Sequence, residues 1–402
     1  MNIAFYTEQE ITPYTGGIGR VTSILTEYFR HHFGWRVYSL YADQVSYDKV
    51  VVDGACQGRL HDRWGIRRGI RTNVQQAARF LQAHQVDVVI VQTSIDVPGR
   101  LRRALQQIGY DAKVITCLHF TPGKDIFLNH LSDLKGVSPF SKQGLKIVLK
   151  SVLSVLYNPL ITHLTRICYR RAYQYSDGVY LLSKSYQEDF CAFSGVYDRQ
   201  KLHTMPNPLS FNVNVPASVL EHKKPVVLVV GRMSEYEKRI SIILSVWHRF
   251  EQAYPESEWQ LKIVGGGTSL ADYKKQKAAL GLKKCCFEGV QNPVPYYRES
   301  KIFLMTSAFE GFPMTLVEAA QFGCVPVVMN AFSSLPEIVT DQHNGVVVEN
   351  NDETQFLRAM EHLMADGDYW HQLAANALHD CQRFSQEAIC MQWKKNLEEL
   401  VK

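Results

Sequence analysis

The chain has 402 residues, of which 46% are hydrophobic and 21% charged, a composition that excludes a disordered or collagen-like protein. Because a single hydrophobic core stops growing near about 250–300 residues, this length predicts two domains. The formal net charge of +5 comes from the first 200 residues, which are basic. No DNA- or RNA-binding module accompanies this charge, so we expect no nucleic-acid partner.

The nine cysteines are odd in number and scattered, without a CxxC or Cys/His cluster. This pattern is typical of reduced thiols in a cytoplasmic protein and predicts neither a structural zinc nor any other metal site. The first residues lack the basic segment of a signal peptide. No apolar run reaches the roughly 18–20 residues that span a bilayer, so we expect no transmembrane segment.

Strand and helix patterns alternate along the first 208 residues. Short apolar runs predict buried strands at Asn2–Thr7, Trp35–Tyr41, Val86–Gln92, Lys113–Phe120 and Gly178–Ser183. Amphipathic segments predict helices at Val21–His31, at Val74–His84 and from Tyr186 onward. This alternation indicates a parallel sheet covered by helices.

The pattern stops at Met205-Pro206-Asn207-Pro208 and restarts at Pro225. Further strands are predicted at Pro225–Val230, Leu261–Val264, Cys286–Val290, Lys301–Thr306, Val325–Met329 and Gly345–Val348. We therefore expect an α/β protein with a domain at 1–208, a linker at 209–224, a second domain at 225–384 and a C-terminal helix at 385–402 that returns to the first domain. Two doubly wound units facing each other place a ligand cleft at the carboxyl ends of both sheets.

The most informative segment runs from Glu310 to Glu318. Gly311 permits a tight turn after a strand, and Pro313 suits the first turn of a helix. The first helical amides lack backbone partners and lie at the positive end of the helix dipole, which favours phosphate oxygens. The expected anion site comprises Gly311, Phe312, Pro313, Met314, Thr315 and Leu316, with Glu318 one turn into the helix. A nucleotide diphosphate sugar fits this layout: Glu318 would take ribose hydroxyls and Glu310 would reach the sugar.

Three further segments of the sequence add to this site. Arg232 and Lys238 follow a strand, where two cations can neutralise a diphosphate and stabilise it as a leaving group. Gly16-Gly17 precede a helix and permit close approach of a ligand, but they equally fit an ordinary helix entry. His119 ends an apolar strand, where a ligand contact and a satisfied core histidine are equally good interpretations.

These motifs together resemble the GT-B fold retaining glycosyltransferases of family 4, the glycosyl transferases group 1. The resemblance is strongest over residues 225–350, in Gly231-Arg232, Lys238, Gly265-Gly266-Gly267 and the pair Glu310 and Glu318. It implies two Rossmann-like domains, a nucleotide-sugar donor in the second domain and an acceptor on the first. It also implies retention of anomeric configuration, with Glu310, Arg232, Lys238 and His119 at the reacting centre. Lys238 follows Arg232 by six residues where many members have five, so Arg239 is a further candidate to share the role of Lys238.

Residues 134–176 contain no acidic side chain. Lys142, Lys146 and Lys150 are spaced by four and form one stripe of a helix that also has an apolar face, and Pro159 is expected to interrupt this helix. A basic amphipathic helix predicts peripheral contact with an anionic membrane surface, here the inner face of the plasma membrane, although packing within its own domain is the alternative.

The sequence therefore predicts a glycosyltransferase acting on a glycan or lipid-linked saccharide in bacterial surface polysaccharide assembly, with no cofactor. The alternative is a catalytically silent scaffold that binds a sugar nucleotide in a membrane assembly complex. A nucleotide-sugar epimerase is a third idea without support in these motifs. Asp366-Gly367-Asp368 has the form of a metal-binding DxD motif, but Asp-Gly is a common turn pair, so we do not expect a metal there.

Overall fold

The computed structural model describes residues 1–9, 16–43, 57–59, 66–92, 95–123 and 142–402, without the side chains of 8–9, 42–43, 57–59, 66–73 and 142–157. The chain forms two compact units. Unit 1 contains Met1–Pro208 and Ile389–Lys402, and unit 2 contains Leu209–Ala388. The segment 209–224, expected to be a linker, is thus the first part of unit 2, and it includes a short 3-10 helix at Ala217–His222.

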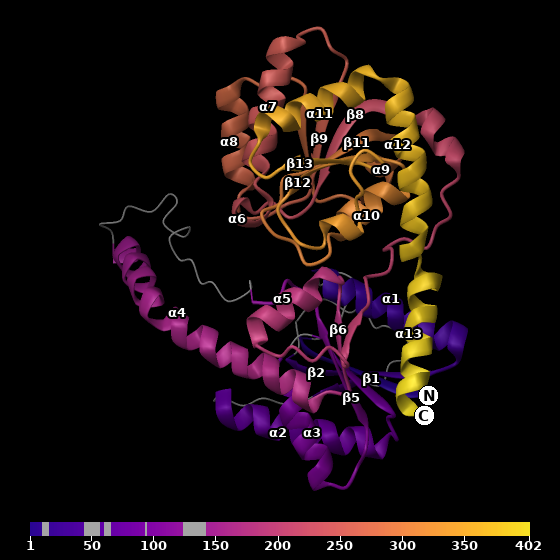
Figure 1. Ribbon diagram of the computed structural model, residues 1–402. Coiled ribbons are helices and arrows are strands. Elements are labelled where there is room, and N and C mark those ends of the chain that lie inside the picture. The colour runs from indigo at the N-terminus through magenta and orange to yellow at the C-terminus, as the bar shows by residue number, and fades with distance from the viewer. Residues whose placement is uncertain (10–15, 44–56, 60–65, 93–94, 124–141) are drawn as a thin grey trace. The chain divides into compact units, whose positions relative to one another are not determined.

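Unit 1 contains a parallel sheet of seven described strands in the order β3-β2-β1-β4-β5-β6-β7 (Figure 1). The strands are β1 Asn2–Gln9, β2 Arg36–Asp43, β3 Gln57–Arg59, β4 Val88–Val91, β5 Lys113–Leu118, β6 Gly178–Leu181 and β7 Leu202–Thr204. The helices are α1 Gly16–Phe33, α2 Ile66–Ala83, α3 Val97–Gln107, α4 Lys142–Tyr175 and α5 Ser185–Ser194, followed by α13 Gln386–Val401, which belongs to unit 1 from Ile389 onward.

Alternate residues of β1 face the two helical layers of unit 1. Ala4 and Tyr6 pack in the same cluster as α2 and α3. Phe5, on the opposite face, stacks on Phe29 of α1. The central strand β4 is buried along its whole length. Helices cover both faces of this parallel sheet, which explains why its central strands are continuous apolar runs.

The helix α4 is one continuous helix of 34 residues with Pro159 inside it, so the expected interruption at Pro159 is wrong (Figure 1). Proline removes one backbone hydrogen bond and distorts a helix locally, but the remaining hydrogen bonds of a long helix persist on both sides of it. Leu160 and Leu164, one turn apart on this helix, are 55% and 52% exposed. None of the described helices combines the length and the apolarity that crossing a bilayer requires.

Unit 2 contains a parallel sheet of six described strands in the order β10-β9-β8-β11-β12-β13. The strands are β8 Lys224–Val230, β9 Gln260–Val264, β10 Cys285–Gly289, β11 Ser300–Met305, β12 Val325–Asn330 and β13 Val346–Glu349. The helices are α6 Glu235–Lys238, α7 Ile240–Ala253, α8 Leu270–Leu280, α9 Val294–Glu299, α10 Met314–Gln321, α11 Glu353–Ala365 and α12 Gly367–Asp380. The eight described cysteines are free, and the adjacent pair on β10 alternates, with Cys285 buried and Cys286 exposed.

The glycines after β9 make direct backbone contact with the loop after β8. Gly265 has a φ of +138°, and a Cβ there would lie 1.9 Å from the carbonyl oxygen of Gly231. Gly267 has a φ of +154°, and its Cβ would lie 2.6 Å from the carbonyl oxygen of Met233. The Met233 amide donates to the carbonyl oxygen of Gly266 at 2.8 Å. In unit 2 these glycines therefore form a turn that closely supports the segment carrying Arg232.

This contact predicts a large effect of Gly265→Ala on stability. Strain at the positive φ adds about 1–3 kcal/mol, and the clash with Gly231 adds a further ~1–3 kcal/mol. We expect the free energy of unfolding, measured by urea denaturation, to fall by at least ~2 kcal/mol.

The control is Gly281→Ala, at the end of α8, where φ is +67° and a Cβ meets no atom within 4 Å. This variant should lose only the roughly 1–2 kcal/mol of a left-handed alanine. Equal losses in the two variants would mean that the Gly231 contact is unimportant.

Candidate active site

The residues of unit 2 that are expected to bind the donor lie on loops at the point where the strand order reverses. From β8 the chain continues to β9 and β10 on one side of the sheet and then crosses to β11 on the other side. The loops that follow β8 and β11 therefore diverge at the carboxyl edge of the sheet. Ligands of doubly wound sheets bind at such a point. Arg232 lies on the first loop and Glu310 on the second.

Hydrogen bonds connect the segment after β8 with the segment after β11. The Thr306 hydroxyl, just after β11, donates to the carbonyl oxygens of Lys238 and Arg239 at 2.9 and 3.0 Å. The Ala308 amide donates to the carbonyl of Glu237 at 2.7 Å. The C-terminus of α6 is thereby fixed against the start of the loop that carries Glu310.

Lys238 forms an ion pair with Glu310. The side chains are 21% and 12% exposed, so the pair is only partly screened by water. Arg239 has a different role. Its guanidinium donates to the carbonyls of Thr306 and Ser307 at 2.7 and 3.1 Å and to two asparagines. The geometry therefore places Lys238, and not Arg239, beside Glu310.

Arg232 has a side chain that is 69% exposed. One of its terminal nitrogens donates to both carboxylate oxygens of Glu237, at 2.8 and 2.6 Å. Each of the two cations expected to hold a diphosphate is thus compensated by a carboxylate in this structure: Arg232 by Glu237 and Lys238 by Glu310.

The helix α10 begins at Met314, with Pro313 as its N-cap. The Leu316 amide donates to the carbonyl of Pro313 at 3.0 Å, so the expectation that it is available to a phosphate is wrong. A 3-10 bond that tightens the first turn is the reason. Within the described part of the chain, no acceptor pairs with the amides of Met314 and Thr315. The helix terminus therefore retains two donors for an anion.

The residues before this helix are fixed by packing. Phe312 and Pro313 are buried. The ring of Phe312 contacts the ring of Phe384 edge to face, with the ring centroids 5.4 Å apart. The carbonyl of Gly311 accepts a hydrogen bond from the buried Ser334 at 3.1 Å. These contacts hold the turn whose end presents the amides of Met314 and Thr315.

Glu318 is only 1% exposed. One carboxylate oxygen accepts from the hydroxyl of Ser210, and the other accepts from the hydroxyl of Tyr297 at 2.9 Å. Neither Ser210 nor Tyr297 was found from the sequence. They lie 108 and 21 residues away from Glu318 along the chain, and no local motif marks them.

In unit 1, His119 directly follows β5 and is half-buried. Its Nε2 is hydrogen-bonded to Oε1 of Gln92, at the end of β4. Because a carbonyl oxygen only accepts, Nε2 carries the proton and Nδ1 remains an acceptor. Burial lowers the pKa of His119 to about 4, so the imidazole is neutral at neutral pH.

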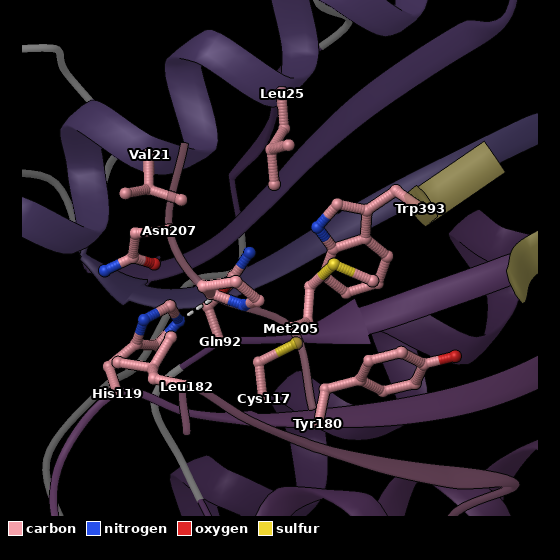
Figure 2. A pocket seen from close by; sticks show the side chains of 11 residues that line it. Val21, Leu25, Gln92, Cys117, His119, Tyr180, Leu182, Met205, Asn207 and Trp393 are labelled. Carbon is pink, nitrogen blue, oxygen red and sulfur yellow. Dashed lines mark hydrogen bonds between the residues drawn. The ribbon is translucent and has the colours of Figure 1, made fainter. Parts of the chain in front are cut away.

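His119 and Gln92 line a small, mainly apolar pocket of unit 1. Figure 2 shows His119, Gln92, Met205 and Trp393 around this pocket, opposite Val21 and Leu25 of α1. The ring of Tyr180 in β6 stacks on the ring of Trp393 in α13, with the ring centroids 4.8 Å apart, and this contact fixes one wall of the pocket. His119 is therefore both hydrogen-bonded within the unit and open to a cavity, so the two interpretations of this residue are compatible.

Other sequence-predicted positions have simpler surroundings. Gly16 and Gly17 form the exposed first turn of α1, where Gly16 has a φ of +80° and a Cβ on either residue would meet no atom within 4 Å. The side chains of Lys142, Lys146 and Lys150 lie outside the described residues, although their backbone belongs to α4. Asp366 caps α12 by accepting from the amide of Tyr369 at 2.9 Å.

Comparison with known proteins links this arrangement to sugar transfer. Residues 211–380 match the family model of glycosyl transferases group 1. An alpha-1,4-N-acetyl-D-galactosaminyltransferase of Campylobacter jejuni is 23% identical over 69% of this chain and 75% of its own length. The amylovoran biosynthesis glycosyltransferase AmsD of Erwinia amylovora is 27% identical over 44% of this chain. That match spans 48% of AmsD, about half of its length.

Solved glycosyltransferase structures share the fold across the chain. The lipopolysaccharide outer core galactosyltransferase WaaB has a TM-score of 0.73 at 19% identity, with 99% of each chain covered. Anabaena HepE in complex with UDP has a TM-score of 0.73 at 17% identity, covering 99% of this chain and all of its own. The two doubly wound units are those of the GT-B fold, and residues 211–380 of this chain are similar to the glycosyl transferases group 1.

Proposed function

We propose that this glycosyltransferase moves a sugar, with retention of anomeric configuration, from a nucleotide diphosphate sugar to a glycan or lipid-linked saccharide in bacterial surface polysaccharide assembly. The observation that carries the proposal is the contact of Lys238 with Glu310, in the loop that leads to α10, where the strand order of unit 2 reverses and where Arg232 also lies. The relatives named for amylovoran and lipopolysaccharide synthesis support the acceptor class.

The donor diphosphate replaces the carboxylates that now compensate the two cations. Arg232 exchanges Glu237 for phosphate oxygens, and Lys238 exchanges Glu310. The amides of Met314 and Thr315 supply two more donors. Glu310 then contacts the sugar of the donor. UDP in the HepE complex supports a uridine donor as the first to test.

We infer that Glu310 and Glu318 do not act as a glycosidase dyad. Glu318 is buried and bonded to Ser210 and Tyr297, so it is not placed to attack a sugar carbon. We therefore propose that the departing phosphate takes the acceptor's proton on the face from which it leaves. Catalysis then depends on stabilising the negative charge of the leaving diphosphate. We also propose that no metal is needed, since the two cations supply that charge and Asp366 of the DxD sequence caps a helix.

The function is tested by incubating the full chain with UDP-, GDP- and ADP-sugars in the presence of EDTA. A ligand of the folded state raises the melting temperature, which selects the nucleotide. Transfer to a saccharide acceptor, followed by mass spectrometry, then separates an enzyme from a silent scaffold. Binding without turnover would favour the scaffold, and the absence of binding to all three donors would refute the proposed site.

Arg232→Ala should lower kcat by about 10²–10³-fold, because it removes a preorganised contact to the leaving group. Its side chain is largely exposed, so the melting temperature should stay unchanged. The matched control is Arg249→Ala, an exposed arginine of α7 outside the site, which should retain wild-type kinetics. Near-normal turnover in Arg232→Ala would remove Arg232 from the assignment.

His119 makes stability depend on pH. Its folded pKa is about 4, whereas an unfolded histidine has a pKa near ~6.5. Between these values the unfolded chain binds a proton that the folded chain does not, so stability is lost as the pH falls through this window. We expect the melting temperature of His119→Gln to fall less than that of the wild type between about pH 7 and about pH 5.

The control for this measurement is His31→Gln, which changes an exposed histidine at the end of α1. Its melting temperature should follow the wild-type pH profile. Parallel profiles for the wild type and His119→Gln would show that the buried imidazole does not govern this loss.

We further propose that α4 attaches the protein to an anionic membrane on the cytoplasmic face. The helix contains no acidic residue, and it carries Lys142, Lys146 and Lys150 together with the exposed Leu160 and Leu164. Basic residues near such a surface contribute about 1 kcal/mol each, and exposed leucines enter the interface.

Replacing Lys142, Lys146 and Lys150 by glutamate should lower partition onto phosphatidylserine-containing vesicles at least about tenfold in a sedimentation assay. Glutamates at Lys274, Lys275 and Lys277 of α8 change the net charge equally and should have little effect. An equal drop in both triple variants would indicate a general charge effect, and no drop would assign α4 to packing alone.

A further inference from the structure

The buried carboxylate of Glu318 has two hydroxyl partners with different surroundings. Tyr297 is fully buried, whereas Ser210 is partly exposed. Each partner donates to a different carboxylate oxygen of Glu318. A buried carboxylate needs such donors because removal from water is otherwise costly. The two partners therefore determine both the direction of the carboxylate and the route by which a ligand can reach it.

Tyr297 is rigidly held. Its ring stacks on Phe322 with the ring centroids 5.8 Å apart and the planes 8° from parallel. Its carbonyl accepts from the ammonium of Lys223 at 2.7 Å. Its hydroxyl reaches Glu318 at 2.9 Å. A side chain packed in this way cannot leave the carboxylate without disturbing the core of unit 2.

Hydrogen bonds hold the backbone on both sides of Ser210. On one side, the Leu209 amide donates to the carbonyl of Phe384 at 2.7 Å. On the other side, the amide group of Gln321 donates to the carbonyls of Phe211 and Val213 at 2.8 and 3.1 Å. The backbone around Ser210 is therefore fixed, but its hydroxyl leaves Glu318 by a rotation about a single bond, between staggered rotamers.

We propose that Tyr297 is a positioning residue for Glu318 and that the Ser210 hydroxyl occupies the place of a donor ribose hydroxyl until the donor binds. This inference rests on the proposed function, in which Glu318 takes ribose hydroxyls. Ser210 rotates away, and the ribose hydroxyl donates to the carboxylate oxygen that Ser210 releases. Tyr297 keeps the other oxygen, so the carboxylate stays aimed at the ribose throughout.

The proposal predicts opposite effects for the two partners. Binding of UDP and of 2′,3′-dideoxy-UDP is measured by calorimetry on the full chain, with GDP or ADP and their dideoxy forms if the thermal series selects them. A hydroxyl bonded to a carboxylate makes the wild type prefer UDP by about tenfold. Tyr297→Phe keeps the ring and should lose most of this preference, weakening UDP alone. Ser210→Ala should bind UDP as tightly as the wild type or a few-fold tighter, because it removes a competitor.

The same variants separate positioning from stability in steady-state kinetics. Tyr297→Phe should raise the donor KM about tenfold with little change in kcat, because the ribose is remote from the reacting bond. Tyr296→Phe is the matched control: it lies next to Tyr297 on α9, and its hydroxyl bonds to Glu288 at 3.2 Å. It should retain the wild-type preference for UDP.

The outcomes are distinct. Loss of UDP and dideoxy-UDP affinity to the same extent in Tyr297→Phe would make Tyr297 merely structural. Weaker UDP binding in Ser210→Ala would show that Ser210 supports the donor and would overturn the exchange, even if Tyr297→Phe were unstable. A wild type that binds UDP and dideoxy-UDP equally would separate Glu318 from the ribose while leaving the donor site intact. No binding of any nucleotide would refute the proposed function itself.

Discussion

The site of unit 2 depends on close backbone contact among three loops at the carboxyl edge of its sheet. Gly265 approaches the carbonyl of Gly231 so closely that no side chain fits. Thr306 then ties the end of α6 to the end of β11. Together these contacts bring charges from two distant segments to one place. Without them, Arg232 and Lys238 would be ordinary surface cations.

These charges are balanced in pairs. Arg232 contacts Glu237, and Lys238 contacts Glu310. The exposed Arg232–Glu237 pair contributes little to stability, because water and salt screen it, and the Lys238–Glu310 pair is partly screened. They are therefore replaceable by a ligand of higher charge at small cost. A diphosphate suits this arrangement, since it brings two negative groups to two cations that the fold already holds near each other.

The helix α10 carries backbone donors in its first turn and a buried carboxylate one turn later. Its first turn presents the amides of Met314 and Thr315, while one turn later Glu318 is enclosed by the chain. The packing that encloses Glu318 also orients it through Tyr297. In the proposed function, the amides and the carboxylate on this one short helix would set the distance between the phosphate end and the ribose end of a donor.

The sequence alone determined the alternation of strands and helices, the break at Pro208, and the position of a helix start after Pro313, because these features depend on local periodicity and on proline and glycine. It did not reveal the three-residue strands β3 and β7, which are too short to show a pattern.

Tertiary structure alone decided that Lys238 and not Arg239 faces Glu310, since those partners lie 72 residues apart. It also buried Glu318 between Ser210 and Tyr297. Such pairings depend on how distant loops meet at a sheet edge, which local patterns do not specify.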